Sequence, residues 1–559
     1  MPFNPDPPQD EDIVRWFVQP QDVAPGRFEL ALVLGGTVSA GAYTAGVLDF
    51  LFEALDAFEV AKGSGKVPPH DVVLRVIAGT SGGGVNAAIA ARALAYDFPH
   101  VTRGSPPPAA DEAANPFYDV WVNRLQLTGF LDPSDIGRDV PAVLNGAPID
   151  AAALWLETYA TPKMVSRSWI AAPLTVIFTV TNVSGVPYRM AFGETLGEMF
   201  VDHADHVRFA LRYPGQQIVE PRPDEFTLGF DAQRVKQASA WSDLSLYARA
   251  TSAFPLGFPT RQLARPLEHY RWRVVPLPPG PDGAGPAWKV LRPDWEAMTG
   301  GAAPFPEDYH FSAVDGGATN NEPFPLAHMA LAGVTGRNKR SPKDADRAVL
   351  LVDPFAGRAP VGGPGISGLA KTAGATLTAL LQQTRYATAD LVLAAEDNVA
   401  SRFMLTATRS GRTGSEAIAS GGLGAFIGFA SPAFMRHDYL LGRANCQQFL
   451  RETFLLDATN DLFVHYGNGQ KQAARRPIVP LCGPAAVAET LDPWPRGALR
   501  PEDFRNDIEA RFRGILETEL AGTVRGVLLG WLGAHGGQKE AADYVIGAMN
   551  AYLTNAGLS

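Results

Sequence analysis

The sequence predicts an α/β fold with a mostly parallel central sheet, because of three consecutive segments near its start. Residues 28–34 are a short apolar run that ends at a glycine pair, which is typical of a buried strand. Residues 40–60 carry apolar side chains at helical spacing, and residues 72–78 form a second short apolar run. Since a helix that joins two neighbouring strands leaves them parallel, this strand–helix–strand order predicts a parallel sheet.

The same patterns predict the remaining elements. A loop rich in Gly and Pro at residues 62–70 follows the first helix, and a helix is expected over residues 85–95. Further strands are expected over residues 174–181, 348–352 and 403–407. Segments dense in Pro and Gly, expected to be insertions or linkers, are 103–116, 276–286 and 357–365.

The chain divides into three expected parts. At 559 residues it is long enough for more than one domain. Residues 1–27 are expected to be a polar arm, and residues 28–411 to be the α/β core, with insertions near 97–170 and 262–300. Residues 412–559 are expected to be a mostly helical C-terminal region.

The net charge and the cysteine content indicate which classes of partner and which cellular compartment are favoured. With 48 basic against 58 acidic residues the net charge is −10, which disfavours a nucleic-acid partner. Two cysteines make no disulfide framework, and no secretory signal is evident at the start. No run of about 18 apolar residues predicts a spanning helix. We therefore expect a cytoplasmic protein that can touch a membrane through a local patch.

The most informative motif is Gly-x-Ser-x-Gly at residues 79–83, between an expected strand and an expected helix. This is the pattern of a nucleophile elbow, in which Ser81 stands exposed on a turn too tight for side chains on both flanks. The helix that follows would stabilise negative charge developing beside the serine. The motif in this context predicts a serine hydrolase.

A serine nucleophile needs a base. Histidine is the usual base, but His310, His328 and His437 occur in no catalytic motif, and each is more typical of a structural or surface histidine. A second candidate is Asp315, in the sequence Asp315-Gly316-Gly317 at the end of an expected sheet element.

Together these motifs resemble the patatin-like phospholipase family, in a bacterial form with a C-terminal extension. The resemblance covers residues 28–407. It rests on the glycine loop and helix start at residues 32–48, the elbow at 79–83, the small-residue and proline stretch at 250–255, and Asp315-Gly316-Gly317.

The resemblance implies a three-layer αβα sandwich and a Ser–Asp dyad that hydrolyses acyl esters of lipids, phospholipids first, without a metal or cofactor. Ser81 would be the nucleophile and Asp315 would accept its proton. Backbone N–H groups of Gly35, Gly36 and Thr37 would form the oxyanion hole. The glycines of the elbow and of the aspartate motif are Gly79, Gly82, Gly83, Gly316 and Gly317.

The first loop departs from the family pattern, which reads Gly-Gly-Gly-x-Arg/Lys-Gly. Ala40 stands where the basic residue belongs, and the triplet becomes Gly36-Thr37-Val38. Either the loop is shifted by one residue and uses Gly35 and Gly36, or two glycines are replaced. Because of this departure, an alternative function stays open: a catalytically silent lipid-binding or regulatory protein with the same fold.

Two other functions are alternatives for these residues: a histidine-assisted esterase and a nucleotide-binding site. A histidine-assisted esterase would use His310 or His437 as its base. A nucleotide site in the first loop is disfavoured, because neither Gly-x-Gly-x-x-Gly nor Gly-Lys-Ser/Thr occurs there. The segment 436–446 is expected to be a helix that docks through Tyr439, Leu440 and Leu441, with Cys446 as a buried thiol.

Overall fold

A computed structural model describes most of the chain. The residues that it does not describe are 1–7, 66, 106–113, 191–196, 218, 231–235, 278–287, 303, 335, 356–391, 397, 464–473 and 519–536. The expected linker at 357–365 and most of those at 103–116 and 276–286 therefore lie outside the described residues.

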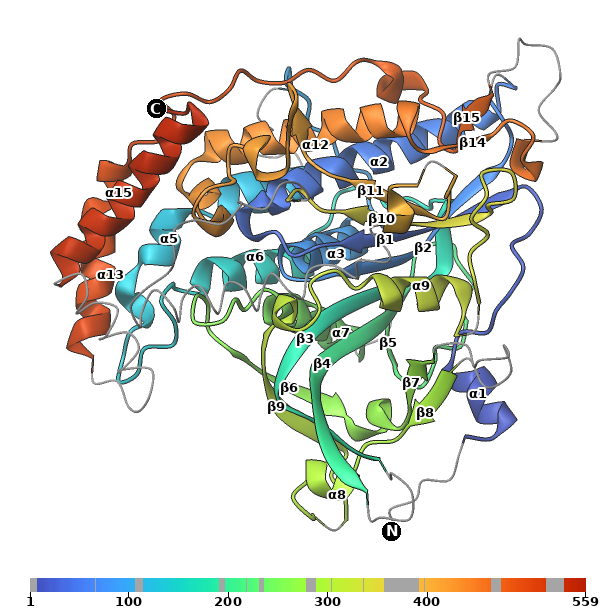
Figure 1. The fold of residues 1–559 in the computed structure, drawn as a ribbon, viewed down its shortest axis with the longest axis horizontal. Helices are drawn as coiled ribbons and strands as arrows, with labels where there is room; N and C mark the ends of the chain where they lie inside the picture. Colours follow the sequence, from blue (N-terminus) through green and yellow to red (C-terminus); the bar gives the residue numbers. More distant parts are fainter. Residues whose placement is uncertain are drawn as a thin grey trace.

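A nine-stranded sheet forms the centre of the molecule (Figure 1). Along the sheet the order is β11-β10-β1-β2-β3-β4-β5, with β9 paired to β3 and β6 paired to β9. Neighbours from β11 to β3 are parallel, and the pairs β3–β4, β3–β9 and β6–β9 are antiparallel. The strands are β1 (Arg27–Leu34), β2 (Asp71–Gly79), β3 (Ile170–Met190), β4 (Glu198–Arg212), β5 (Glu225–Gly229), β6 (Arg261–Pro266), β9 (Asp308–Asp315), β10 (Arg347–Val352) and β11 (Arg402–Leu405).

Helices and small hairpins surround this sheet. The α-helices are α1 (Asp10–Trp16), α2 (Gly41–Lys62), α3 (Gly82–Ala93), α4 (Pro116–Tyr118), α5 (Leu127–Leu131), α6 (Ala147–Thr158), α7 (Lys236–Thr251), α8 (Trp295–Met298), α9 (Phe324–Ala332), α12 (Pro432–Glu452), α13 (Arg505–Glu517) and α15 (Gln538–Ala556). A π-helical turn, η2, spans Asp119–Arg124. Two-stranded pairs are β7 (Arg273–Pro276) with β8 (Trp288–Leu291), β12 (Thr408–Arg409) with β13 (Arg412–Thr413), and β14 (Leu455–Asp457) with β15 (Arg475–Pro477).

Both faces of the sheet are buried along its central strands β10, β1 and β2, which confirms the expected three-layer αβα fold. Alternate residues of β1 show this: Leu32 joins the core beneath α2, α3 and α7, whereas Val33 joins a separate core with Phe324 and Leu331 of α9. A strand covered on both faces reads as a continuous apolar run, as residues 28–34 do. In Figure 1 the helices α2 and α12 lie on one side of β1 and β10, and α9 lies on the other.

The expected elements compare closely with the observed ones near the start of the chain. The helix over 40–60 is α2, and the strands over 28–34 and 72–78 are β1 and β2. The helix expected over 85–95 begins earlier, at Gly82, because the elbow starts a helix directly behind Ser81. In the segment expected to be a polar arm, Trp16 of α1 is buried and meets Trp272 edge to face, with ring centroids 5.2 Å apart.

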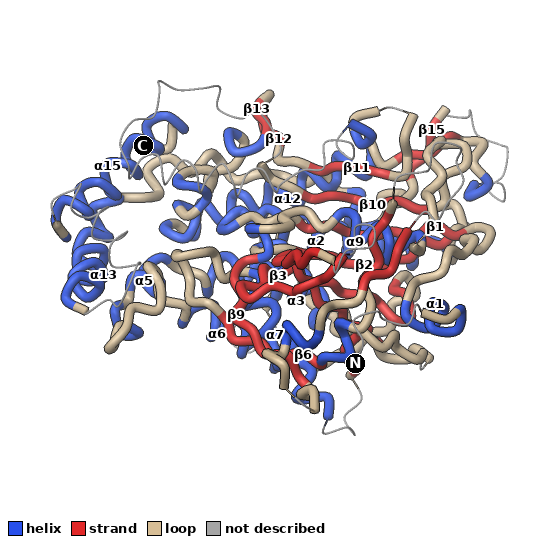
Figure 2. Tube along the Cα trace, turned by 60° about the horizontal axis from the view of Figure 1, so that its bottom comes forward, coloured by secondary structure: helices blue, strands red, loops and turns tan. Residues whose placement is uncertain are grey.

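The C-terminal region is helical, as expected, and it packs closely on the core. A Cβ on Gly46 of α2 would lie 1.9 Å from the carbonyl oxygen of Tyr439, and one on Gly442 of α12 would lie 2.1 Å from that of Tyr43. These reciprocal glycines let the two helix backbones touch. Figure 2 shows α13 and α15 grouped with α5 at one end of the molecule, where they share a small apolar core.

Among the described residues, one helical segment, Val38–Lys62, is long and apolar enough to cross a membrane by length and composition. It includes α2, and 89% of its most apolar stretch is buried inside the protein. The segment therefore has the burial of a core helix.

A buried ion cluster links α12 to α2. Arg443 is fully buried and donates to Asp49, and to Glu53 and Glu489 at 2.6 Å each. Burial alone would raise the pKa of the Asp49 carboxyl, but the neighbouring His100 and Arg443 hold this pKa well below its usual range. Arg443 is the group that all three carboxylates of this cluster share, and His100 also contacts Asp49, at 2.8 Å.

We expect Arg443→Met to lower the free energy of unfolding by about 3–5 kcal/mol, because it leaves buried carboxylates without their counter-ion. Urea unfolding followed by tryptophan fluorescence measures the loss. Arg451→Met, an exposed position on the same helix, is the matched control and should change little. Equal losses in the two variants would contradict a structural role for the cluster.

Candidate active site

Ser81 occupies a sharp turn between β2 and α3. Its backbone has φ 54° and ψ −127°, a conformation that a non-glycine residue adopts only at a cost of about 1–3 kcal/mol. The turn needs glycine beside it: a Cβ on Gly83 would lie 2.1 Å from the carbonyl oxygen of Leu34, and one on Gly79 would lie 2.6 Å from that of Gly83. Ser81 therefore stands directly before the first turn of α3, with the geometry expected of a nucleophile elbow.

The structure brings Ser81 and Asp315 together. The Ser81 Oγ donates to Asp315 Oδ2 at 2.5 Å, and the other carboxylate oxygen accepts from the Gly317 N–H at 2.7 Å. Both residues are buried, with 8% of Ser81 and 3% of Asp315 exposed. The carboxylate is thus held in one orientation, with one oxygen left for the serine.

Burial raises the pKa of the Asp315 carboxyl to about 7, although the hydrogen bonds from Ser81 and from the Gly317 amide oppose the shift. A carboxylate with this pKa is a much stronger base than an ordinary aspartate. It is also matched to proton transfer near neutral pH.

Strand β3 sets the distance between the two residues. Gly79, at the end of β2, pairs with Phe178 of β3, and Asp315, at the end of β9, pairs with Val180 on the same edge of β3, since β4 occupies the opposite edge at both positions. The two chain segments are far apart in sequence, and they meet because β2, parallel to β3, and β9, antiparallel to it, end next to each other on that edge. Strand β3 also anchors the elbow, since the Thr80 and Thr179 hydroxyls are 2.6 Å apart.

The segment 250–255 holds both members of the pair. The Thr251 hydroxyl accepts from the Ser81 N–H at 2.9 Å, and the carbonyl oxygen of Ala253 accepts from the Asp315 N–H at 2.8 Å. The sequence singled out this stretch only by its resemblance to the family. Its contacts explain why it is composed of small residues: its backbone runs directly beside the site.

Two of the three expected oxyanion-hole residues offer a free backbone donor. The Gly35 N–H already donates to the carbonyl oxygen of Val352 at 3.1 Å, so Gly35 is a poor candidate for that role. Across the part of the chain that the structure describes, no acceptor takes the N–H of Gly36 or of Thr37. Gly36 lies against the nucleophile, since a Cβ placed on it would be 3.2 Å from Ser81 Cβ.

Ala40, at the position of the family's basic residue, is buried at the end of the 3₁₀ turn Val38–Ala40. The neighbouring Ser39 hydroxyl donates to the carbonyl oxygen of Ala425, in the C-terminal region. The first loop is therefore held by a contact with the C-terminal region, a contact that nothing in the loop's own sequence indicated.

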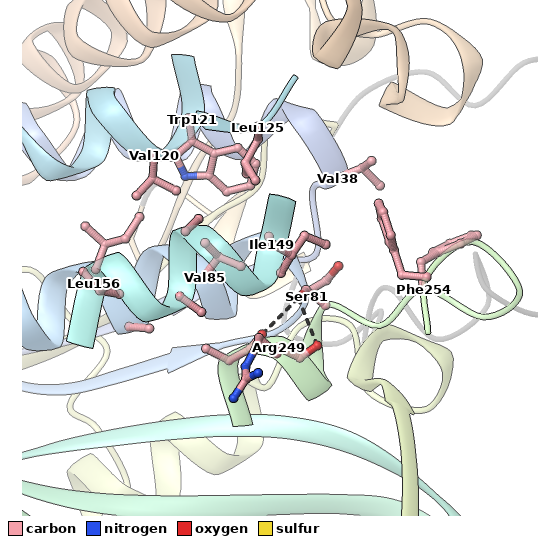
Figure 3. A pocket seen from close by; sticks show the side chains of 18 of the residues that line it. Val38, Ser81, Val85, Val120, Trp121, Leu125, Ile149, Leu156, Arg249 and Phe254 are labelled. Atoms are coloured by element: carbon pink, nitrogen blue, oxygen red, sulfur yellow. Dashed lines mark hydrogen bonds between the residues drawn. The ribbon is translucent and has the colours of Figure 1, made fainter. Parts of the chain in front are cut away.

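A narrow apolar pocket opens at Ser81 (Figure 3). Its cavity volume is about 70 Å³. Helices, the turn at 254–258 and the C-terminal region all contribute to its wall. The lining residues are Val38, Ser81, Gly82, Val85, Ala88, Ile89, Val120, Trp121, Leu125, Phe130, Ile149, Ala152, Ala153, Leu156, Ser245, Ala248, Arg249, Ser252, Phe254, Phe258, Phe426 and Phe429.

The sequence did not identify this wall. Phe426 meets Phe254 edge to face at 5.7 Å, although the two are far apart in the chain, and such a contact leaves no signal in a single sequence. Asn321 was also missed: its Oδ1 lies so close to Gly36 and Gly317 that a Cβ on either glycine would be within 2.6 Å of it.

None of the candidate histidines lines this pocket, and among the described residues Ser81 Oγ is hydrogen-bonded to Asp315 rather than to a histidine. His310 is exposed on β9, and His328 lines a different cavity. His437 is buried on α12, where its Nδ1 is 2.9 Å from Asp438 and its ring meets Trp494. The helix over 436–446 is therefore structural, as expected, and Cys446 is buried within it.

Comparison with known proteins agrees with this geometry. Residues 32–328 match the sequence profile of the patatin-like phospholipases, a family of lipid acyl hydrolases. The uncharacterized protein y4iI of Sinorhizobium fredii is 32% identical over 533 residues, covering 84% of this chain and 72% of that protein. The family match spans the glycine loop, the elbow and Asp315, and the chain therefore belongs to the patatin-like phospholipase family.

Proposed function

We propose that this protein hydrolyses acyl esters of lipids, phospholipids first, with Ser81 as nucleophile and Asp315 as its base. The observation that carries the proposal is the 2.5 Å hydrogen bond from Ser81 Oγ to Asp315 Oδ2 at the mouth of an apolar pocket. A hydroxyl aimed at a buried carboxylate of raised pKa is arranged to lose its proton as it attacks.

In the first half of the reaction, Ser81 Oγ attacks the acyl carbonyl and its proton passes to Asp315. The carbonyl oxygen becomes an oxyanion that the N–H groups of Gly36 and Thr37 can stabilise, together with the N-terminus of α3. The tetrahedral intermediate then expels the alcohol, which takes the proton from Asp315. An acyl-enzyme ester on Ser81 remains.

In the second half, Asp315 takes a proton from a water molecule that attacks this ester. The second tetrahedral intermediate collapses, the fatty acid leaves, and the proton returns to Ser81. The oxyanion donors are backbone groups, so the loss of the family's basic residue at Ala40 does not remove them.

The apolar pocket at Ser81, the acyl pocket, supports the proposal that a long acyl chain is the group transferred to the serine. Its wall is almost wholly apolar, and Arg249, the charged side chain in it, is 3.3 Å from Asp150 through its Nη1. Leu256 and Leu423, on the turns that carry Phe254 and Phe426, are 54% and 39% exposed. Exposed leucines on these turns support lipid entry from a membrane surface by peripheral contact.

The test is fatty-acid release by the full chain from phosphatidylcholine vesicles and from p-nitrophenyl esters of increasing chain length. The same protein is then treated with a fluorophosphonate, which labels an activated serine. We expect hydrolysis that favours longer acyl chains, and a label on Ser81 found by peptide mass spectrometry. Binding to vesicles without hydrolysis or label would favour a silent lipid-binding protein instead.

The proposal also predicts a pH profile. Because Asp315 must be ionised to act as base and its pKa is about 7, kcat/KM should rise with pH and level off above neutrality. Rates measured from pH 5 to 9 with a p-nitrophenyl ester, corrected for the pH dependence of the product's absorbance, give the midpoint. A midpoint near 4, the value of an ordinary aspartate, would contradict the assigned base.

A further inference from the structure

A second cavity lies apart from Ser81, bounded by α9 on one side and by strands β3, β4 and β7 on the other. Its volume is about 580 Å³, against about 70 Å³ for the pocket at Ser81. Neither Ser81 nor Asp315 lines it. Figure 1 shows α9 on the face of the sheet opposite α2, with β7 and α1 nearby.

The wall of this cavity is rich in arginine. Its described lining holds two aspartates, Asp205 and Asp224, against a larger set of guanidinium groups. Arg208 is 3.0 Å from Asp224, and Arg265 is 3.0 Å from Asp205. Arg273 also pairs with a carboxylate, that of Asp202, which lies outside the lining. Among these described residues, five arginines thus stand against three carboxylates, which gives the wall a net positive charge. The arginines that line it are Arg208, Arg265, Arg273, Arg337 and Arg402.

Two half-buried histidines, His206 and His269, lie beside these arginines. Burial, together with the charges of Arg208, Arg265 and Arg273, lowers the pKa of His206 well below its usual value. Burial and Arg265 lower the pKa of His269 to about 3. Both imidazoles are therefore neutral at pH 7 and add no charge to that of the arginines.

The rest of the wall is apolar and aromatic. Trp272 and Phe17 lie on the side of β7 and α1, and Leu326 and Met329 come from α9. A ligand bound in this cavity would therefore contact both arginine side chains and large apolar side chains. Arginine binds phosphate and carboxylate groups through paired N–H donors, which suits an anion carried on an apolar body.

We propose that this cavity is a binding site for a small organic anion, a phosphate or carboxylate group on an apolar or aromatic body. The site is distinct from the acyl pocket, from which the contact between Thr80 and Asn320 separates it. The Thr80 hydroxyl donates to the Asn320 carbonyl oxygen at 3.1 Å, and Asn320 lines the cavity. Binding at this site therefore does not depend on Ser81.

The test is isothermal titration of the full chain at low ionic strength with three probes that share one ring system: 1-naphthyl phosphate, 1-naphthoate and 1-naphthol. None of them is an acyl ester. We expect one site for at least one anion, with the neutral naphthol at least about tenfold weaker and the affinity falling as salt is added. The tighter of the two anions identifies the preferred group.

Variants place the anion within the cavity. Arg337→Gln and Arg402→Gln should each weaken binding of the tighter anion by about fivefold or more. Arg271→Gln is the matched control, because Arg271 is exposed, pairs with Glu268 at 2.8 Å and does not line the cavity. Its binding should be unchanged, and all three variants should keep the melting temperature of the natural chain.

Ser81→Ala keeps this proposal separate from the proposed hydrolysis. The variant should bind the anion as the natural chain does, whether or not the natural chain hydrolyses esters. The anion site is overturned if naphthol binds as tightly as the anions, if no probe binds below about 10 mM, or if Arg271→Gln weakens binding as much as Arg337→Gln.

Discussion

Ser81→Ala is expected to abolish ester hydrolysis, with kcat/KM lower by a factor on the order of 10⁴–10⁶. The substitution removes the atom that forms the acyl-enzyme, while the elbow keeps its contacts through the backbone, including the Ser81 N–H to Thr251. Release of fatty acid from phosphatidylcholine vesicles, with protein purified under identical conditions, measures the loss. The fluorophosphonate label should vanish in the same variant.

The matched control is Ser252→Ala. Ser252 lines the same pocket, but its hydroxyl donates to the Ala248 carbonyl oxygen at 3.0 Å rather than to the carboxylate of Asp315. The control should keep its label and most of its activity. If instead the label persists in Ser81→Ala, the reactive serine lies elsewhere and the elbow has no part in the chemistry.

Asp315→Asn is expected to lower kcat/KM by about 10²–10⁴-fold. The amide is nearly the same size as the carboxyl, and its oxygen can still accept from the Gly317 N–H, but it cannot take the proton of Ser81. Single-turnover acylation with a p-nitrophenyl ester separates this loss from any change in deacylation.

The same variant is expected to be more stable than the natural chain above neutral pH. Asp315 has a pKa raised from 3.8 to about 7, so ionising it in the folded protein costs up to about 4 kcal/mol. This penalty is absent below about pH 4, grows between pH 4 and 7, and is complete above pH 7. Asparagine never ionises, so the melting temperatures of the two proteins should separate over this range.

Asp308→Asn, at the other end of β9, is the control for both measurements and should leave the activity almost unchanged. An Asp315→Asn variant that keeps full activity would return attention to a histidine-assisted esterase. His310→Ala, on the same strand, is then the informative variant.

Much of the fold was predictable because its central strands are buried on both faces. The runs over 28–34, 72–78 and 348–352 correspond to β1, β2 and β10, whose apolar residues the two covering layers require. Strands β4 and β6 were not predicted, whereas the sheet element expected to end at Asp315 is β9. Strand β6 alternates buried and more exposed residues, and the first half of β4 is largely exposed, with charged residues that interrupt its apolar pattern.

The sequence by itself determined the family, the elbow, and the two residues of the proposed dyad, because tight turns and an exposed serine require particular residues in consecutive positions. Only the tertiary structure decided how these parts meet. Strands β2 and β9 end next to each other on one edge of β3, which brings Gly79 and Asp315 together, and burial of that junction gives the carboxyl its raised pKa. The acyl pocket and the arginine-lined cavity likewise depend on the tertiary structure, because their walls come from segments hundreds of residues apart, and such contacts leave no pattern along one chain.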